Sequence, residues 1–141
     1  MKRFTFRLEK ALSLRKHHEQ EAKNELGRAM SILNEIEHNI KINAQKHSAA
    51  AQERFVEMNT NPASMLDWDA YIKRLEQEAQ RLAEEAARAE ALVEEKRILY
   101  LEASRDLKIM EKLKEKKALE HRKEMLAAET LERDDAWRGK R

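Results

Sequence analysis

The sequence predicts an all-α protein, an antiparallel two-helix coiled coil in which the second helix is longer than the first. Three observations predict this fold. Charged residues make up 40% of the chain, which has only two glycines and one proline, a composition typical of long helices. The one proline, Pro62, lies in a short cluster of helix-breaking residues. On both sides of that cluster, apolar residues recur at alternating spacings of three and four.

We expect the first helix at about residues 4–58. Spacings of three and four select one row of positions, which we call the seam: Leu8, Leu12, Arg15, Glu19, Ala22, Leu26, Ala29, Leu33, Ile36 and Ile40. The pattern falters at Asn43 and His47. We expect it to resume one position later, at Ala44, Ser48, Ala51, Phe55 and Met58. A shift of this kind changes the supercoil locally.

The turn is expected at about residues 59–64, where breaker residues are concentrated. Two starts of the next helix are consistent with the sequence. Asn61 can cap a helix that has Pro62 at its first position. Alternatively, Ser64 and Asp67 form a weaker version of the capping box.

The second helix is expected at about residues 65–137, with a longer and cleaner seam. Its positions are Trp68, Ile72, Leu75, Ala79, Leu82, Ala86, Ala89, Val93, Lys96, Tyr100, Ala103, Leu107 and Met110. A short break between two long amphipathic helices favours a hairpin, which would place Ile40 near Leu82. The apolar pattern fades beyond Leu113, where the first helix would no longer reach. We therefore expect residues 1–141 to form a single coiled-coil hairpin.

Charge is distributed unevenly along this hairpin. Residues 1–20 hold six Lys or Arg and two Glu, and residues 105–125 hold eight Lys or Arg and five acids. Residues 76–95 hold seven Glu and two Arg. The open end of the hairpin is therefore expected to be basic and its middle acidic, although the formal net charge is only +2.

The sequence carries no pattern of an enzyme, a cofactor site or a metal site. It has no cysteine, and no two of its five histidines are four residues apart, the spacing that would place two ligands on one helical face. A two-helix hairpin also offers no enclosed pocket for catalytic carboxylates. The basic run near the C-terminus is interleaved with glutamates and lacks aromatics spaced for base stacking, so we expect no nucleic-acid binding. No apolar run is long enough to span a membrane.

Aromatic residues near the two ends of the hairpin are the candidates for partner binding. Trp68 and Tyr71 lie just after the turn, where they either close the hairpin with Phe55 and Met58 or form a partner surface. Phe4 and Phe6 precede the seam, so they either protect the helix end from fraying or dock a partner.

Three stretches of the sequence resemble the family of the bacterial flagellar export protein FliJ. They are the opening FTFRLEKALSLRKHHEQEA, the stretch WDAYIKRLEQE after the turn, and the end KLKEKKALEHRKEMLAAETLERDDAWRGKR. The opening is the most specific, because it fits a Phe-x-Phe-x-Leu-Glu pattern followed by Leu-x-x-Arg-x-x-x-Glu. Near the end, Asp134 and Asp135 stand where the family pattern has Asp-Glu.

The resemblance implies a non-enzymatic, stalk-like component of the flagellar type III export apparatus. It implies contacts with the export ATPase ring, the export gate in the membrane and export chaperones, and a cytoplasmic place at the inner membrane beneath the flagellum. On this basis, the expected partner-binding residues are Phe4, Phe6, Leu8, Leu12, Arg15, Lys112, Lys116, Trp68 and Tyr71. The ring would face residues 4–15 and 108–123. A generic coiled-coil scaffold, or a nucleic-acid-binding arm of a larger complex, is the alternative.

Overall fold

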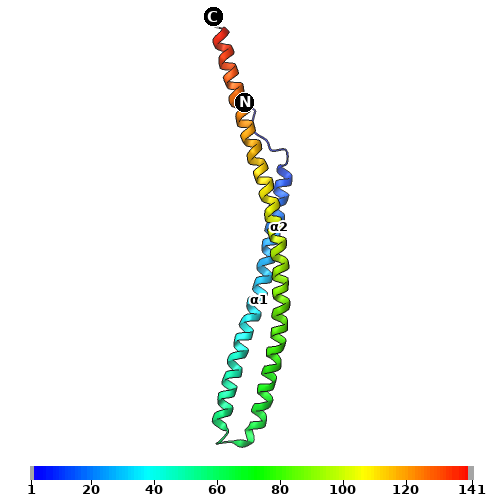
Figure 1. Cartoon of the computed structure of the whole chain (residues 1–141), viewed down its shortest axis with the longest axis vertical. Coiled ribbons are helices and arrows are strands. Elements are labelled where there is room, and N and C mark those ends of the chain that lie inside the picture. Colours follow the sequence, from blue (N-terminus) through cyan, green and yellow to red (C-terminus); the bar gives the residue numbers. More distant parts are fainter. Residues whose placement is uncertain (1, 140–141) are drawn as a thin grey trace. The chain divides into compact units, whose positions relative to one another are not determined.

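A computed structural model describes residues 2–139 as two α-helices packed against each other as a hairpin, with the second helix longer (Figure 1). Helix α1 spans Glu9–Glu57, the short 3₁₀ helix η1 spans Pro62–Ser64, and α2 spans Met65–Gly139. The predicted fold class is confirmed. The chain divides into two compact units, which are described separately: unit 1 comprises Met1–Ala22 and Leu99–Arg141, and unit 2 comprises Lys23–Ile98.

Helix α1 begins at Glu9 and not near residue 4, as the sequence had suggested. Residues 2–6 have no regular secondary structure, and the Glu9 N–H donates to the carbonyl of Phe6 at 3.1 Å. The run Phe4-Thr5-Phe6 consists of aromatic and β-branched residues, which favour a helix less than the Leu, Ala, Glu and Lys that follow. Phe4 and Phe6 therefore lie on a non-helical segment that precedes α1.

The core of unit 2 is a narrow seam of small and medium apolar side chains. Its buried apolar residues are Ala29, Ala50, Leu75, Leu82, Ala89 and Val93. All of them except Ala50 were assigned to the seam from the sequence. Ala79, which was also assigned to it, is exposed.

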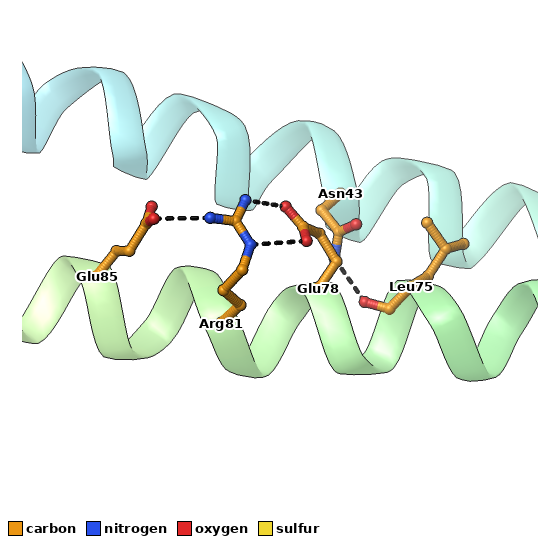
Figure 2. Close-up of polar contacts among 5 residues, drawn as sticks. All are labelled: Asn43, Leu75, Glu78, Arg81 and Glu85. Atoms are coloured by element: carbon orange, nitrogen blue, oxygen red, sulfur yellow. Dashed lines mark hydrogen bonds and ion pairs between the residues drawn. The ribbon is translucent and has the colours of Figure 1, made fainter.

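The expected one-position shift of the seam after Ile40 is wrong. The original register continues through Asn43, which is 8% exposed, and the half-buried His47. Asn43 Nδ2 donates to the carbonyl oxygen of Leu75 at 3.0 Å (Figure 2), and His47 Nε2 lies 3.3 Å from Glu76 Oε1. Because both polar side chains find partners on α2, the helix keeps its register without burying an unpaired polar group.

The residues that the shift would have buried are all exposed. They are Ala44, Ser48, Ala51, Phe55 and Met58.

The turn between the helices is closed by backbone hydrogen bonds. The N–H groups of Thr60 and Asn61 both donate to the carbonyl of Glu57, at 3.1 and 2.8 Å. Pro62 is the first residue of η1, and Asn61 makes no side-chain capping bond. Ser64 Oγ donates to Glu57 Oε2 at 2.7 Å and lies 2.8 Å from the carbonyl oxygen of Asn61. The second proposed cap, Ser64 with Asp67, is therefore not the arrangement that starts α2.

Unit 1 is built from the first turns of α1, the segment before them and the C-terminal part of α2. Leu12 is its fully buried side chain, at 2% exposure. Ion pairs join the helices between Arg15 and Asp106 at 3.4 Å and between Glu9 and Lys114 at 3.0 Å. Among the described residues, no helix combines the length and apolar character needed to cross a membrane.

Candidate partner-binding surfaces

The segment Lys2–Leu8, which we call the N-terminal strap, lies against α2 in unit 1. Its two aromatic residues, Phe4 and Phe6, are half-buried. The ring centroid of Phe4 is 5.5 Å from that of His121, with the ring planes at 50°. A tilted pair at this distance is a favourable aromatic arrangement. The strap therefore covers part of α2 beyond Leu113, where the sequence had suggested little packing.

The strap and α2 line a pocket of ≈ 650 Å³ in unit 1 that is open to solvent. From α2 the lining residues are Leu113, Lys117, Glu120, His121 and Glu124. Each of them is three or four residues from another of the set, so they share one helical face. From the strap, three cations line it: Lys2, Arg3 and Arg7. The rim is thus basic along the strap and carries two carboxylates along α2.

The residues expected to face the ATPase ring do not form one surface in the structure. Leu12 is buried and Arg15 is paired with Asp106, whereas Leu8 is 39% exposed beside the pocket. Lys112 and Lys116 are exposed and do not line the pocket. Their positions on the helix fall on the side of α2 turned away from α1. Unit 1 thus offers two separate faces, the strap with its pocket and the outer side of α2.

The turn end of unit 2 holds Trp68 and Tyr71, both half-buried. Their ring centroids are 6.2 Å apart at an angle of 70°, an edge-to-face pair. Trp68 Nε1 donates to Glu57 Oε2 at 2.8 Å. This bond, followed by that from Ser64, lowers the pKa of Glu57. Trp68 therefore joins the two helices across the turn.

Phe55 and Met58 do not belong to this cluster, which corrects the expectation that they close the hairpin end. Phe55 is 71% exposed, and Val56, Met58 and Leu66 are also exposed. Leu66 was not singled out in the sequence, although its position two residues before Trp68 takes it off the seam face. We call these four residues the turn-end apolar patch.

A charged cluster lies on α2 in unit 2, one turn from the buried Asn43–Leu75 contact (Figure 2). Arg81 donates from Nε to Glu78 Oε2 at 2.9 Å and from Nη1 to Glu85 Oε1 at 2.7 Å, and its Nη2 bonds Glu78 Oε1. These bonds lower the pKa of Glu78 and raise that of Arg81. The cluster is an exposed i,i+3 and i,i+4 network that supports the helix.

The part of the chain from 2 to 139 contains no cluster of three or more His, Cys, Asp or Glu arranged to hold a metal ion. Three surfaces are candidates for partner binding: the strap with its pocket, the outer side of α2 and the turn-end apolar patch.

Comparison with known proteins gives one match. The model of the family described as "Flagellar FliJ protein" matches residues 4–138, which is nearly the whole chain. No curated protein matches, and no solved structure matches.

Proposed function

The chain belongs to the FliJ family of flagellar proteins, and from that premise we propose that it is a stalk that engages the export ATPase ring through unit 1. Membership makes it a non-enzymatic component of the flagellar export apparatus. The ring contact, the coupling to the export gate and the contact with export chaperones are the proposed part. The family match covers both helices and the turn, so it favours this function over a generic scaffold or nucleic-acid-binding arm.

The observation that carries the ring contact is the strap of unit 1. Its Phe4 side chain is held on His121, so the segment has a defined position before any partner arrives. Preordering lowers the entropy that binding must overcome. The strap presents Lys2, Arg3 and Arg7 together with the partly exposed Leu8. A basic rim beside an apolar contact suits an acidic opening in a protein ring, where charge speeds association.

The two phenylalanines act in this proposal mainly by positioning the strap. Because they are half-buried against α2, their loss should free the segment and its cations. The test measures binding to the cognate ATPase ring and its ATPase rate for Phe4→Ala/Phe6→Ala and for Lys2→Ser/Arg3→Ser/Arg7→Ser. We expect both variants to bind and stimulate less, and only the cation variant to lose most of its salt dependence.

A matched control is Lys41→Ser/Lys46→Ser, which removes two exposed lysines from α1 in unit 2. It should bind the ring normally. Wild-type stimulation by both strap variants would refute the assignment of the ring contact to the strap.

The outer side of α2 is the second part of the proposed ring contact, through Lys112 and Lys116. Lys112→Glu/Lys116→Glu should slow association with the ring most strongly at low ionic strength. Normal association of this variant would restrict the ring contact to the strap.

The turn-end apolar patch of unit 2 is the surface that we propose for the gate or a chaperone. Exposed apolar residues gathered at one end of a helical unit are typical of protein contact sites. Phe55→Ser/Leu66→Ser should weaken capture of one of these partners and leave ring binding unchanged, as measured by pull-down with each purified partner. Trp68 and Tyr71 support the turn beneath this surface. Normal capture of both partners would exclude the patch.

A further inference from the structure

One row of α2 side chains in unit 1 is turned away from α1 and from the strap, and we call it the basic row. Its members lie between Leu101 and Trp137 at spacings of three and four, so they share one helical face. α1 and the strap contact α2 at Asp106, Lys114 and His121, which fall on the opposite side of the helix. Neither of them therefore covers the basic row, which extends for about 54 Å at the helical rise per residue.

The charged members of the basic row are all cations. They are Arg105, Lys108, Lys112, Lys116, Lys123 and Arg133, and all six are exposed. Among residues 2–139, none of the six makes an ion pair, whereas Lys114, on the other side of the helix, pairs with Glu9. The acids Glu115 and Asp134 flank the row, and so does Arg122. This face of α2 thus carries a positive charge that the chain itself does not neutralise.

Large apolar side chains lie among these cations. Leu101, Leu119 and Leu126 are 53%, 54% and 57% exposed, and Trp137, at the end of the row, is 64% exposed. The remaining member is Thr130. Charge alone keeps a helical face in water, so apolar side chains interspersed with the charges indicate a contact that removes them from water.

We propose that the basic row binds the surface of an anionic lipid bilayer, with α2 of unit 1 lying along the headgroup layer. Clusters of roughly four to eight Lys or Arg on a helix are typical of binding to anionic lipids, whose phosphates the cations contact. Leucine and tryptophan side chains on such a helix insert at the boundary between headgroups and acyl chains. The basic row carries side chains for both layers.

Two features favour a lipid surface over another macromolecule. A nucleic acid would neutralise the cations but would leave the leucines and Trp137 against water and phosphate. A protein partner needs a surface of complementary shape, whereas a fluid lipid layer adapts to a convex helix. The pockets of unit 1 beside the strap and beside Leu12 are lined by residues off the row. The row itself thus presents a convex face rather than a groove.

The lipid contact goes beyond the proposed stalk function and does not depend on it. Lys112 and Lys116 belong to both proposed surfaces, so a lipid-bound chain would present fewer cations to the ATPase ring. The experiments below use purified chain and vesicles without a ring, and they vary other positions. Loss of lipid binding is thus distinguishable from loss of the ring contact.

The first experiment measures cosedimentation with vesicles of phosphatidylcholine that contain about 30 mol% phosphatidylglycerol. The wild type should bind them at low salt and should not bind vesicles of phosphatidylcholine alone. Arg105→Gln/Lys123→Gln should bind about 25-fold more weakly, from a factor of about five per cation. Leu119→Gln/Leu126→Gln should bind at least about tenfold more weakly but keep the salt dependence of the wild type.

A matched control is Lys10→Gln/Lys16→Gln, which makes the same change in net charge at exposed positions on α1 in unit 1. It should bind the anionic vesicles nearly as the wild type does. Glutamine favours a helix about as well as lysine, so circular dichroism should show wild-type helicity in every variant. Equal loss of binding in the control and in Arg105→Gln/Lys123→Gln would show attraction by net charge alone and overturn the proposal.

The second experiment follows Trp137 in a Trp68→Phe background, where it is the one remaining tryptophan. Anionic vesicles should shift its emission to shorter wavelength, and lipids brominated near the headgroup should quench it, because indole rings lie at the membrane interface. Unchanged emission from vesicle-bound chain would place another surface on the lipid and would refute the assignment to the basic row.

Absence of vesicle binding at about 0.05 M salt would refute it as well. Two further results would then identify the occupant. Binding to a short DNA duplex that only Arg105→Gln/Lys123→Gln weakens would make the row a nucleic-acid surface. Binding to the purified ATPase ring that the same variant weakens would make the whole row part of the ring contact.

Discussion

Replacing Asn43 by leucine should stabilise the protein, although Asn43 is buried and hydrogen-bonded. Asn43 is 8% exposed, and its Nδ2 donates to the carbonyl oxygen of Leu75 at 3.0 Å. It sits in the seam of unit 2, where the neighbouring buried positions are apolar. An open pocket of ≈ 300 Å³ adjoins it, lined by Ile40, His47 and Leu75 among others, so a leucine side chain has room.

The size of the effect follows from two opposing terms. Burying a leucine side chain contributes about 1.5–3 kcal/mol. Loss of the Asn43 hydrogen bond costs about 1 kcal/mol. The carbonyl oxygen of Leu75 would still accept a backbone hydrogen bond within α2, so it would not be left unpaired. We therefore expect Asn43→Leu to raise the free energy of unfolding by about 1 kcal/mol. That corresponds to a few degrees in Tm, roughly 4 °C for a chain of this size.

The assay is urea denaturation followed by circular dichroism, with Asn34→Leu as the control. Asn34 is an exposed asparagine on the same helix, so its replacement should change stability by less than about 0.5 kcal/mol. A loss of more than about 1 kcal/mol in Asn43→Leu would show that the hydrogen bond outweighs apolar burial in this seam. The expectation that apolar burial outweighs the hydrogen bond at this position would then be refuted.

Four further results are expected. Gly27→Ala should add about 0.5–1 kcal/mol of stability, because Gly27 is inside α1 and a Cβ there meets nothing within 4 Å; unchanged denaturation curves would contradict this. Leu82→Asp buries an unpaired charge at a position 4% exposed, so it should lower the free energy of unfolding by on the order of 3 kcal/mol, as measured by thermal denaturation. Trp68→Phe removes the main donor to Glu57, so its carboxyl pKa, followed by NMR titration, should rise toward 4.5. The backbone amides of residues 127–139 should exchange with solvent before those of the rest of α2, because the strap does not reach them. Amide protection equal to that of unit 2 would contradict this.

The pH dependence that follows from Glu57 has a definite sign. Its pKa is lowered in the folded chain, so its contribution to stability is present above 4.5 and is lost as pH falls through the folded-state value. Glu57→Gln should therefore make stability near the turn less sensitive to acid. Thermal melts at pH 6 and pH 3.5 measure the difference, and an unchanged pH dependence would show that Glu57 does not contribute.

Periodicity predicted the fold and most of the seam, because a two-helix core has only one buried stripe per helix. It failed after Ile40, where Asn43 and His47 occupy buried and half-buried positions. Sequence spacing treats these residues as breaks, but the partners that make them acceptable, Leu75 and Glu76, lie on the other helix. A pattern read along one helix cannot contain a hydrogen bond supplied by another.

The candidate surfaces were predictable only in part, because they too depend on contacts between segments far apart in the sequence. The sequence drew attention to Phe4 and Phe6, but their half-burial depends on the strap leaving the helical path and meeting His121. It also grouped Lys112 and Lys116 with the aromatics, although the helical period places those lysines on another side of α2. The turn-end apolar patch was missed because the expected shift had assigned Phe55 and Met58 to the interior.

The spacing of three exposed lysines on α2 in unit 1 has an energetic consequence for α2 itself. Lys108, Lys112 and Lys116 follow one another at four-residue intervals, and like charges at that spacing destabilise a helix by a few tenths of a kcal/mol per pair. Any polyanion that neutralises them relieves this repulsion and so stiffens the helix it binds. By linkage, its affinity and the melting temperature rise together. Phosphate and sulfate in a buffer therefore raise the stability of this chain. Its melting temperature should be compared only between samples with the same anion concentration.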